Sequence, residues 1–160
     1  MTTLQIDMKR VMAQGVFDIL HSGHLYYLSE SAKLGEELHV VIARDSRIKD
    51  RKNIFMEENE RREIVEAMEM VNSAILGSEG SLFDSVKKIE PDIITLGYDQ
   101  EFDINLLEDQ LREAGFIGIE VVRVKKYERE GLRSSSRIKG NIRSKEGEEI
   151  FFSRKERKIS

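Results

Sequence analysis

The chain of 160 residues contains no cysteine and no tryptophan, and it has a single proline. The absence of cysteine excludes a disulfide framework and a thiolate zinc site. No apolar run approaches the ~20 residues that a helix needs to cross a bilayer. The first ten residues also lack the apolar stretch of a signal peptide. The sequence therefore predicts a cytoplasmic protein with no membrane partner.

An excess of charge of one sign is also missing, because 26 Lys and Arg residues face 30 Asp and Glu residues, giving a net charge of −4. This balance argues against a broad nucleic-acid surface, so an anionic ligand requires a local cluster of donors. Apolar residues make up 39% and charged residues 35%, as is typical of a globular protein. We expect one domain over residues 1–143 and a charged tail over residues 144–160.

The hydrophobic pattern alternates between short strand-like runs and segments with helical spacing. Candidate strands cover residues 11–13, 38–43, 73–76, 92–96 and 119–124. Helical patterns separate them, and a last short helix is expected to begin at the serines of residues 133–139. The alternation predicts an α/β fold with a doubly wound, five-stranded parallel sheet. Ligands bind such sheets at the carboxyl ends of the strands, so the loops after residues 13, 43, 96 and 124 are the candidate positions for a ligand.

The first loop, "GVFDILHSGH" at residues 15–24, holds two of the three histidines of the chain. His24 is expected in the first turn of a helix, where unpaired backbone N–H groups attract anions. Gly23 lets a phosphate approach the backbone, Gly15 leaves room for a ligand, and both imidazoles can donate hydrogen bonds. Two alternatives stay open: the histidines only cap or pack, or they bind a metal. No cysteine and no third nearby histidine support the metal site.

The second loop carries five cations within nine residues, which are Arg44, Arg47, Lys49, Arg51 and Lys52. They either clamp a charged substrate or belong to an ordinary solvated loop. Arg61 follows near the expected start of a helix, where the helix dipole disfavours a cation. It is expected to bind a phosphate or to pair with Glu57 or Glu58.

The remaining two loops offer polar and aromatic groups. Asp99 follows Gly97 and could accept from a ribose hydroxyl or a base amine, hold a metal, or cap a helix. Tyr127 could stack on a base. The serines at 134–136 offer hydroxyls and free N–H groups to a phosphate, although a plain helix cap needs only one serine.

These stretches together resemble the HxGH-containing nucleotidyltransferases of the cytidylyltransferase-like superfamily, from about residue 10 to residue 140. The resemblance rests on "GVFDILHSGH", on "RSSSRI", and on the pattern E-R-x-x-x-V at Glu60, Arg61 and Val65. It implies a Rossmann-like fold and attack of an acceptor phosphate on the α-phosphate of a nucleoside triphosphate. Pyrophosphate would leave, no covalent enzyme intermediate would form, and magnesium would bridge phosphate oxygens.

The resemblance also assigns roles to individual residues. The implied catalytic residues are His21, His24, Lys49, Ser135 and Ser136. Both histidines would also contact the nucleotide, together with Val16, Phe17, Ser22, Gly23, Asp99, Tyr127 and Arg129. The implied substrate-binding residues are Arg44, Arg51 and Arg61, and no protein side chain is assigned to a metal.

Within the superfamily, "VIARD", "ENERREIVEAM" and "PDIITLGYDQEFD" are most similar to the archaeal FAD synthases, which transfer AMP from ATP to FMN. Glycerol-3-phosphate cytidylyltransferases usually carry tryptophan after the aspartate of the fourth loop, where this chain has Gln100. Transfer to glycerol 3-phosphate or to a sugar phosphate is the alternative activity. A nucleotide-binding regulatory domain without catalysis is the alternative of another class. The resemblance further implies a homodimer.

Overall fold

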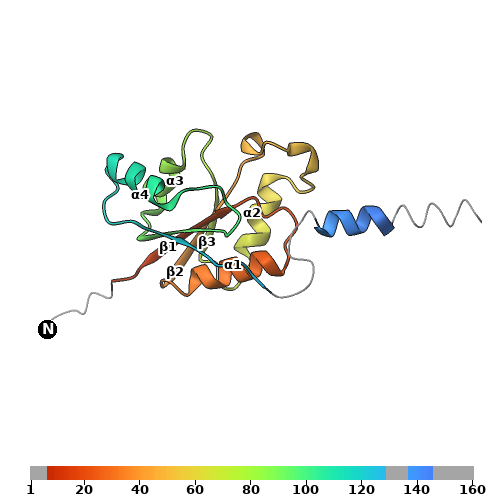
Figure 1. The fold of residues 1–160 in the computed structure, drawn as a ribbon, viewed down its shortest axis with the longest axis horizontal. Coiled ribbons are helices and arrows are strands. Elements are labelled where there is room, and N and C mark those ends of the chain that lie inside the picture. Colours follow the sequence, from red (N-terminus) through yellow and green to blue (C-terminus); the bar gives the residue numbers. More distant parts are fainter. Residues whose placement is uncertain (1–6, 129–136, 146–160) are drawn as a thin grey trace, which may run out of the picture.

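The computed structural model describes residues 7–128 and 137–145, and its centre is a five-stranded parallel sheet (Figure 1). The strands are β1 (Arg10–Gly15), β2 (Glu37–Ile42), β3 (Ser73–Leu76), β4 (Ile93–Leu96) and β5 (Glu120–Arg123). The predicted doubly wound α/β fold is therefore confirmed. Residues 73–76 match their prediction, and the other strands differ from theirs only at the ends.

The order of the strands in the sheet is β3-β2-β1-β4-β5. The chain runs outward from β1 to β3, and then returns to the other side of β1 to form β4. This reversal leaves a crevice between the carboxyl ends of β1 and β4, because the loops that follow these two strands turn away from each other. The strand order thus places the loops after Gly15 and Leu96 on either side of one opening.

Alternate residues of the strands supply two separate cores, one on each face of the sheet. Val11 and Ala13 of β1 belong to the core that includes Leu28 and Val65, while Met12 belongs to the core that includes Val86. The helices are α1 (Ser22–Ala32), α2 (Glu58–Glu66), α3 (Leu82–Ile89) and α4 (Ile104–Glu113). Helices α1 and α2 pack against the first core and α3 and α4 against the second, so both faces of the sheet are covered (Figure 1).

The inner face of α2 differs from the sequence prediction. The helical pattern from Glu57 onward predicted an apolar stripe of Ile64, Met68 and Val71. Ile64 is 39% exposed, however, and the residues that α2 buries are Arg61 and Val65. The helix also ends at Glu66, so Met68 and Val71 lie beyond it. The buried face of α2 therefore lies one residue away from the predicted face. The prediction missed it because a hydrophobic pattern counts an arginine such as Arg61 as solvent-facing.

A network of buried hydroxyl groups joins α1 to the sheet beneath the crevice. The hydroxyl of Tyr27 donates to the carbonyl of Thr95 at 2.9 Å, and the amide of Gln14 donates to the same hydroxyl at 3.3 Å. Ser31 Oγ lies 2.8 Å from Thr95 Oγ1. Burial raises the pKa of Tyr27 to about 12, so its hydroxyl keeps its proton at neutral pH. These bonds fix the ends of β1 and β4 relative to α1.

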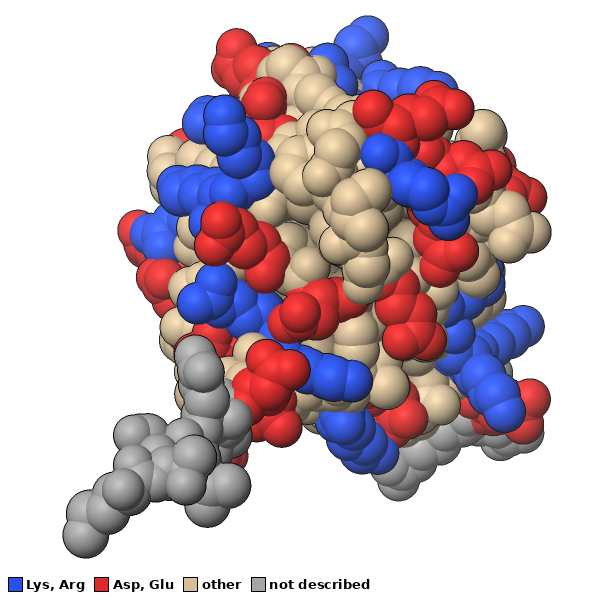
Figure 2. All heavy atoms as spheres, turned by 90° about the vertical axis from the view of Figure 1, so that its left-hand side faces the viewer, with Lys and Arg blue, Asp and Glu red and all other residues tan. Residues whose placement is uncertain are grey.

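Residues 137–145 form a helix at the carboxyl-terminal end of the described chain, and it lies beside the sheet domain (Figure 1). The predicted domain boundary after residue 143 falls within this helix. The serines at 134–136, Arg129 and most of the predicted tail lie outside the described residues. In the described part of the chain, no helix is long and apolar enough to span a bilayer. On the face drawn in Figure 2, side chains of both charges alternate around an uncharged area.

Candidate active site

A cavity of about 620 Å³ opens at the carboxyl ends of β1 and β4. Its walls come from five regions, which are the loops after β1, β2, β4 and β5 and the helix of residues 137–145. Seven of the predicted site residues line it, namely Val16, Phe17, His21, Gly23, His24, Asp99 and Tyr127. The fold therefore brings together residues that the sequence separates by more than 100 positions.

The loop after β1 is shaped by a tight turn at Phe17, which has a φ of 54° although it is not glycine. Its ring folds back under the loop and stacks against Tyr27, with ring centroids 6.4 Å apart. A Cβ added at Gly15 would lie 2.8 Å from this ring. Gly15 was predicted to leave room for a ligand; it lines the cavity, and the ring of Phe17 occupies the space that a Cβ would need.

His21 is the N-cap of α1, since its Nδ1 accepts a hydrogen bond from the amide of Gly23 at 3.0 Å. A neutral imidazole that accepts at one nitrogen carries its proton on the other. The Nε2–H of His21 is therefore the group that can donate to a ligand in the cavity. Ser22, which was predicted to contact the nucleotide, is exposed and is not among the residues that line the cavity.

His24 lies in the first turn of α1, as predicted, and its ring stacks on that of His21 with centroids 3.8 Å apart. Burial, with a smaller effect from His21, lowers the pKa of His24 to about 4. Burial also lowers the pKa of His21, against the opposing charge of Asp99. Both rings are therefore neutral at pH 7. The Nε2–H of His21 and the N-terminus of α1 make this histidine cluster suited to a phosphate chain.

Asp18 is a site residue that the sequence analysis missed. Its side chain is 3% exposed, and it accepts hydrogen bonds from the amides of Phe55 and Met56 at 2.9 to 3.1 Å and from Lys139 Nζ at 2.7 Å. Burial raises the pKa of Asp18, but these donors outweigh it and hold the pKa below its usual value. The signal was available in "VFDIL", because a carboxylate flanked by apolar residues must be buried with partners.

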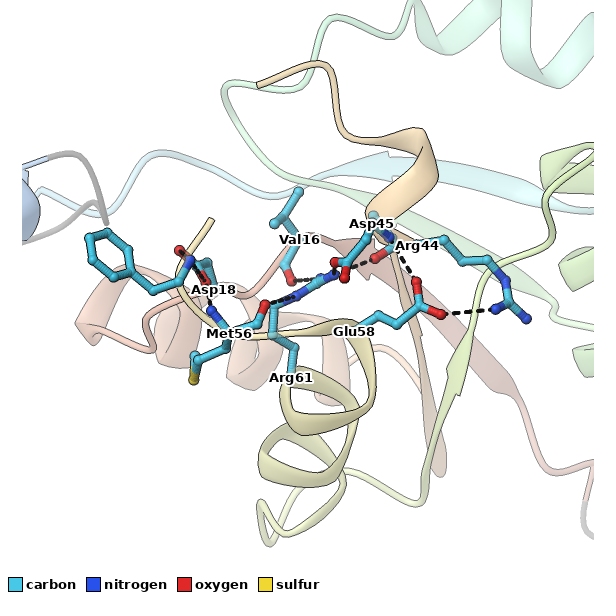
Figure 3. A network of polar contacts seen from close by, with 9 residues as sticks. Val16, Asp18, Arg44, Asp45, Met56, Glu58 and Arg61 are labelled. Atoms are coloured by element: carbon cyan, nitrogen blue, oxygen red, sulfur yellow. Dashed lines mark hydrogen bonds and ion pairs between the residues drawn. The ribbon is translucent and has the colours of Figure 1, made fainter. Parts of the chain in front are cut away.

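Arg61 is buried and does not bind substrate, contrary to prediction. Its side chain is 0% exposed and donates to the carbonyls of Val16 at 2.6 Å, Ala43 at 2.9 Å and Met56 at 3.1 Å. It also forms an ion pair with Asp45 at 2.6 Å, rather than with Glu57 or Glu58 (Figure 3). The guanidinium joins the ends of β1 and β2 to the start of α2, which leaves it no access to a ligand.

The cations of the loop after β2 do not gather in the cavity. Arg44 donates to the carbonyl of Gly77 at 2.7 Å and pairs with Glu58 at 3.1 Å, so its predicted contact with substrate is not seen (Figure 3). Lys49 and Arg51 are exposed and are not among the residues that line the cavity. If Lys49 and Arg51 act on a substrate, they must do so at the rim of the cavity. Their catalytic and substrate-binding roles stay predictions.

The loop after β4 is held by Gln100, at the position where a tryptophan would favour a CTP-using enzyme. The side-chain oxygen of Gln100 accepts from the amide of Gly97 at 3.0 Å, and its amide group donates to the carbonyl of Gln14 at 3.0 Å. This bridge connects the ends of β1 and β4 across the crevice and fixes the loop that carries Asp99.

Tyr127 lies in the wall that the loop after β5 forms, and its ring stacks on that of Tyr26 with centroids 4.8 Å apart. Both tyrosines also line an adjoining hollow of about 750 Å³, together with Tyr98 and Lys126. The flat surfaces at this end of the cavity can receive the ring of a nucleotide base. Within residues 7–128 and 137–145, no group of three or more His, Asp or Glu side chains could hold a metal ion.

The comparisons with known proteins agree with this geometry. A family model described as cytidylyltransferase-like matches residues 12–141, and the chain belongs to this family. The FAD synthase of Thermoplasma volcanium is 47% identical over 142 residues, which cover 88% of this chain and 99% of that protein. The FAD synthase of Methanohalobium evestigatum is 46% identical over 129 residues, which cover 81% and 85% of the two chains.

A solved structure supports the same fold. The crystal structure described as the lipopolysaccharide core biosynthesis protein from Thermoplasma volcanium GSS1 is 49% identical to this chain. The match covers 76% of this chain and 99% of the other, with a TM-score of 0.72.

The buried position of Arg61 predicts a large loss of stability in Arg61→Met. Removing the guanidinium leaves the carboxylate of Asp45 and three carbonyls without their donor, so the free energy of unfolding should fall by about 3 to 5 kcal/mol. Urea unfolding measures the change. Arg62→Met is the matched control, because within the described residues Arg62 pairs with the exposed Glu63 and Glu66, and it should cost less than about 1 kcal/mol. Equal losses in the two variants would contradict the structural role of Arg61.

The lowered pKa values of the histidines predict a loss of stability in acid. As the pH falls from about 6.5 toward 4, the unfolded chain takes up protons that the buried rings of His21 and His24 do not. The free energy of unfolding should therefore decrease as the pH falls through this range. Above about pH 6.5 these two histidines should contribute no further pH dependence. Urea unfolding at about pH 7 and pH 5 measures the decrease, which should be smaller in His24→Gln. A decrease of the same size in that variant would show that His24 is not the responsible group.

Proposed function

We propose that this chain transfers the AMP moiety of ATP to FMN and so produces FAD and pyrophosphate. A phosphate oxygen of FMN attacks the α-phosphorus of ATP, and the bond from that phosphorus to the bridging oxygen of the β-phosphate breaks. The observation that carries the proposal is the name FAD synthase, shared by curated relatives that match this chain over most of both lengths. The donor cluster formed by His21 and His24 supports it, because it suits a reacting triphosphate.

The proposed chemistry depends on position and charge rather than on a covalent intermediate. Negative charge moves toward the leaving pyrophosphate as the bond to the α-phosphorus lengthens. The Nε2–H of His21 can donate a hydrogen bond to that charge, and the pKa values of both imidazoles should rise as the phosphates approach. We assign His21 and His24 to this task, with Ser135 and Ser136 receiving the departing phosphates and Lys49 assisting at the rim.

The two ends of the cavity suit the two substrates. At the end formed by the loops after β4 and β5, we assign Asp99 to the sugar or base of ATP and Tyr127 to stacking on the adenine ring. Arg129 is assigned to the same nucleotide site. The backbone of Val16 and Phe17 completes this nucleotide site. At the end formed by the loop after β2, we assign Arg51 to capture of the acceptor. Arg44 and Arg61 have no part in the proposal, since their head groups bind the protein itself.

We propose that ATP enters as its magnesium complex, with the metal held by phosphate oxygens. The described residues offer no cluster of ligands for a resident ion, which suits a magnesium ion that arrives with its phosphates. We further propose that the enzyme is a homodimer in the cytoplasm, as the sequence analysis predicts.

Incubation of the purified chain with ATP, FMN and magnesium tests the proposal. Chromatography should show FAD, and a coupled assay should show one pyrophosphate for each FAD. Parallel reactions contain CTP with glycerol 3-phosphate, and ATP with a sugar phosphate. The last pair is included because one solved relative is described as a lipopolysaccharide core biosynthesis protein. Reaction of another pair, with no FAD formed from ATP and FMN, would refute the FMN assignment.

His24→Ala should lower kcat by about a hundredfold or more, as expected when a preorganised donor to the transition state is removed. The thermal unfolding midpoint should change little, since the ring is at the edge of the cavity. His39→Ala is the matched control: His39 contacts Ser73 and Glu37 and does not line the cavity, so its kcat should stay within about twofold. Turnover by His24→Ala at the rate of the wild type would show that His24 is structural.

A further inference from the structure

The helix of residues 137–145 is attached to the sheet domain without a buried apolar face. Ile138 and Lys139 are partly buried, the other residues of the helix are exposed, and Ile142 is 49% exposed. An isolated helix of this length is marginal in water and normally depends on packing of an apolar stripe. Polar contacts must therefore decide where this helix lies.

Lys139 makes most of these contacts, and its side chain is only 10% exposed. Its ammonium group lies 2.7 Å from Asp18 Oδ2, donates to the carbonyl of Asn53, and lies 4.8 Å from the centre of the Phe55 ring. Arg143 adds one long contact to Asn53, at 3.4 Å. The ammonium group of Lys139 thus joins the helix to the loops after β1 and β2.

Asp18 is the other half of this link, and it joins three segments of the cavity wall. It belongs to the loop that carries His21, and its carboxylate binds the amides of Phe55 and Met56 in the loop after β2. The same carboxylate binds Lys139 of the last helix. Because both charges are removed from water, loss of either one leaves the other buried without a partner.

We propose that Asp18 and Lys139 are positioning residues for the reaction, and that their ion pair holds the helix of residues 137–145 against the cavity. This helix supplies Arg137 and Lys139 to the cavity wall and follows directly on Ser135 and Ser136. The effect on turnover rests on the proposed function, whereas the link between the two segments does not. Asp18 and Lys139 act through the placement of these groups and bind no substrate atom.

Hydrogen exchange tests the link without any enzymatic activity. In Asp18→Asn and in Lys139→Met of the full chain, amides of residues 137–145 should exchange several times faster than in the wild type at short labelling times. Lys145→Met is the matched control, because it makes the same substitution on an exposed part of the same helix, and its exchange should equal that of the wild type. Unchanged exchange in Lys139→Met would overturn the proposal even if Asp18→Asn failed to fold.

Steady-state kinetics with ATP and FMN distinguish positioning from substrate contact. Each single variant should lower kcat by about tenfold or more and change the KM for ATP by less than about threefold, and Lys139→Arg should recover part of the loss. The double variant should be no worse than the poorer single variant, because both substitutions break one link. Losses that multiply in the double variant would overturn the proposal. So would a raised KM with unchanged kcat in Lys139→Met alone, since that pattern marks a direct contact with ATP.

Discussion

The buried guanidinium of Arg61 is the contact on which the geometry of the cavity depends. It binds the carbonyls of Val16 and Ala43, which lie just past the ends of β1 and β2, and it anchors both to the start of α2. A planar group with five donors can satisfy carbonyls from several segments at once, which no apolar side chain can do. The loops that carry the histidines and the wall of residues 43–57 therefore keep one arrangement relative to the sheet.

The same residues serve local structure and chemistry at the start of α1. His21 caps the helix with one ring nitrogen and presents the other as a donor, so the helix cannot be displaced without moving the donor. Burial keeps His21 and His24 neutral, which allows two rings to stack at 3.8 Å without charge repulsion. The Nε2–H of His21 and the N-terminus of α1 both favour an anion over a cation at this end of the cavity.

Several features of the fold followed from local pattern. Buried parallel strands such as 38–43 are nearly continuous β-branched runs, and the histidine loop was placed correctly because it directly follows a strand. The predictions failed where a side chain has a partner distant in the sequence. Arg61 was assigned to a substrate because its carbonyl partners come from other segments.

The sequence by itself determined the parallel sheet, the position of the crevice and the pair of histidines, because these depend on periodicity and on residues adjacent in the chain. Tertiary structure alone decided which cations form internal ion pairs, such as Arg61 with Asp45 and Lys139 with Asp18. It also decided the neutrality of the imidazoles. Burial and charge pairing act through space, and a linear pattern carries no record of the distances on which they depend.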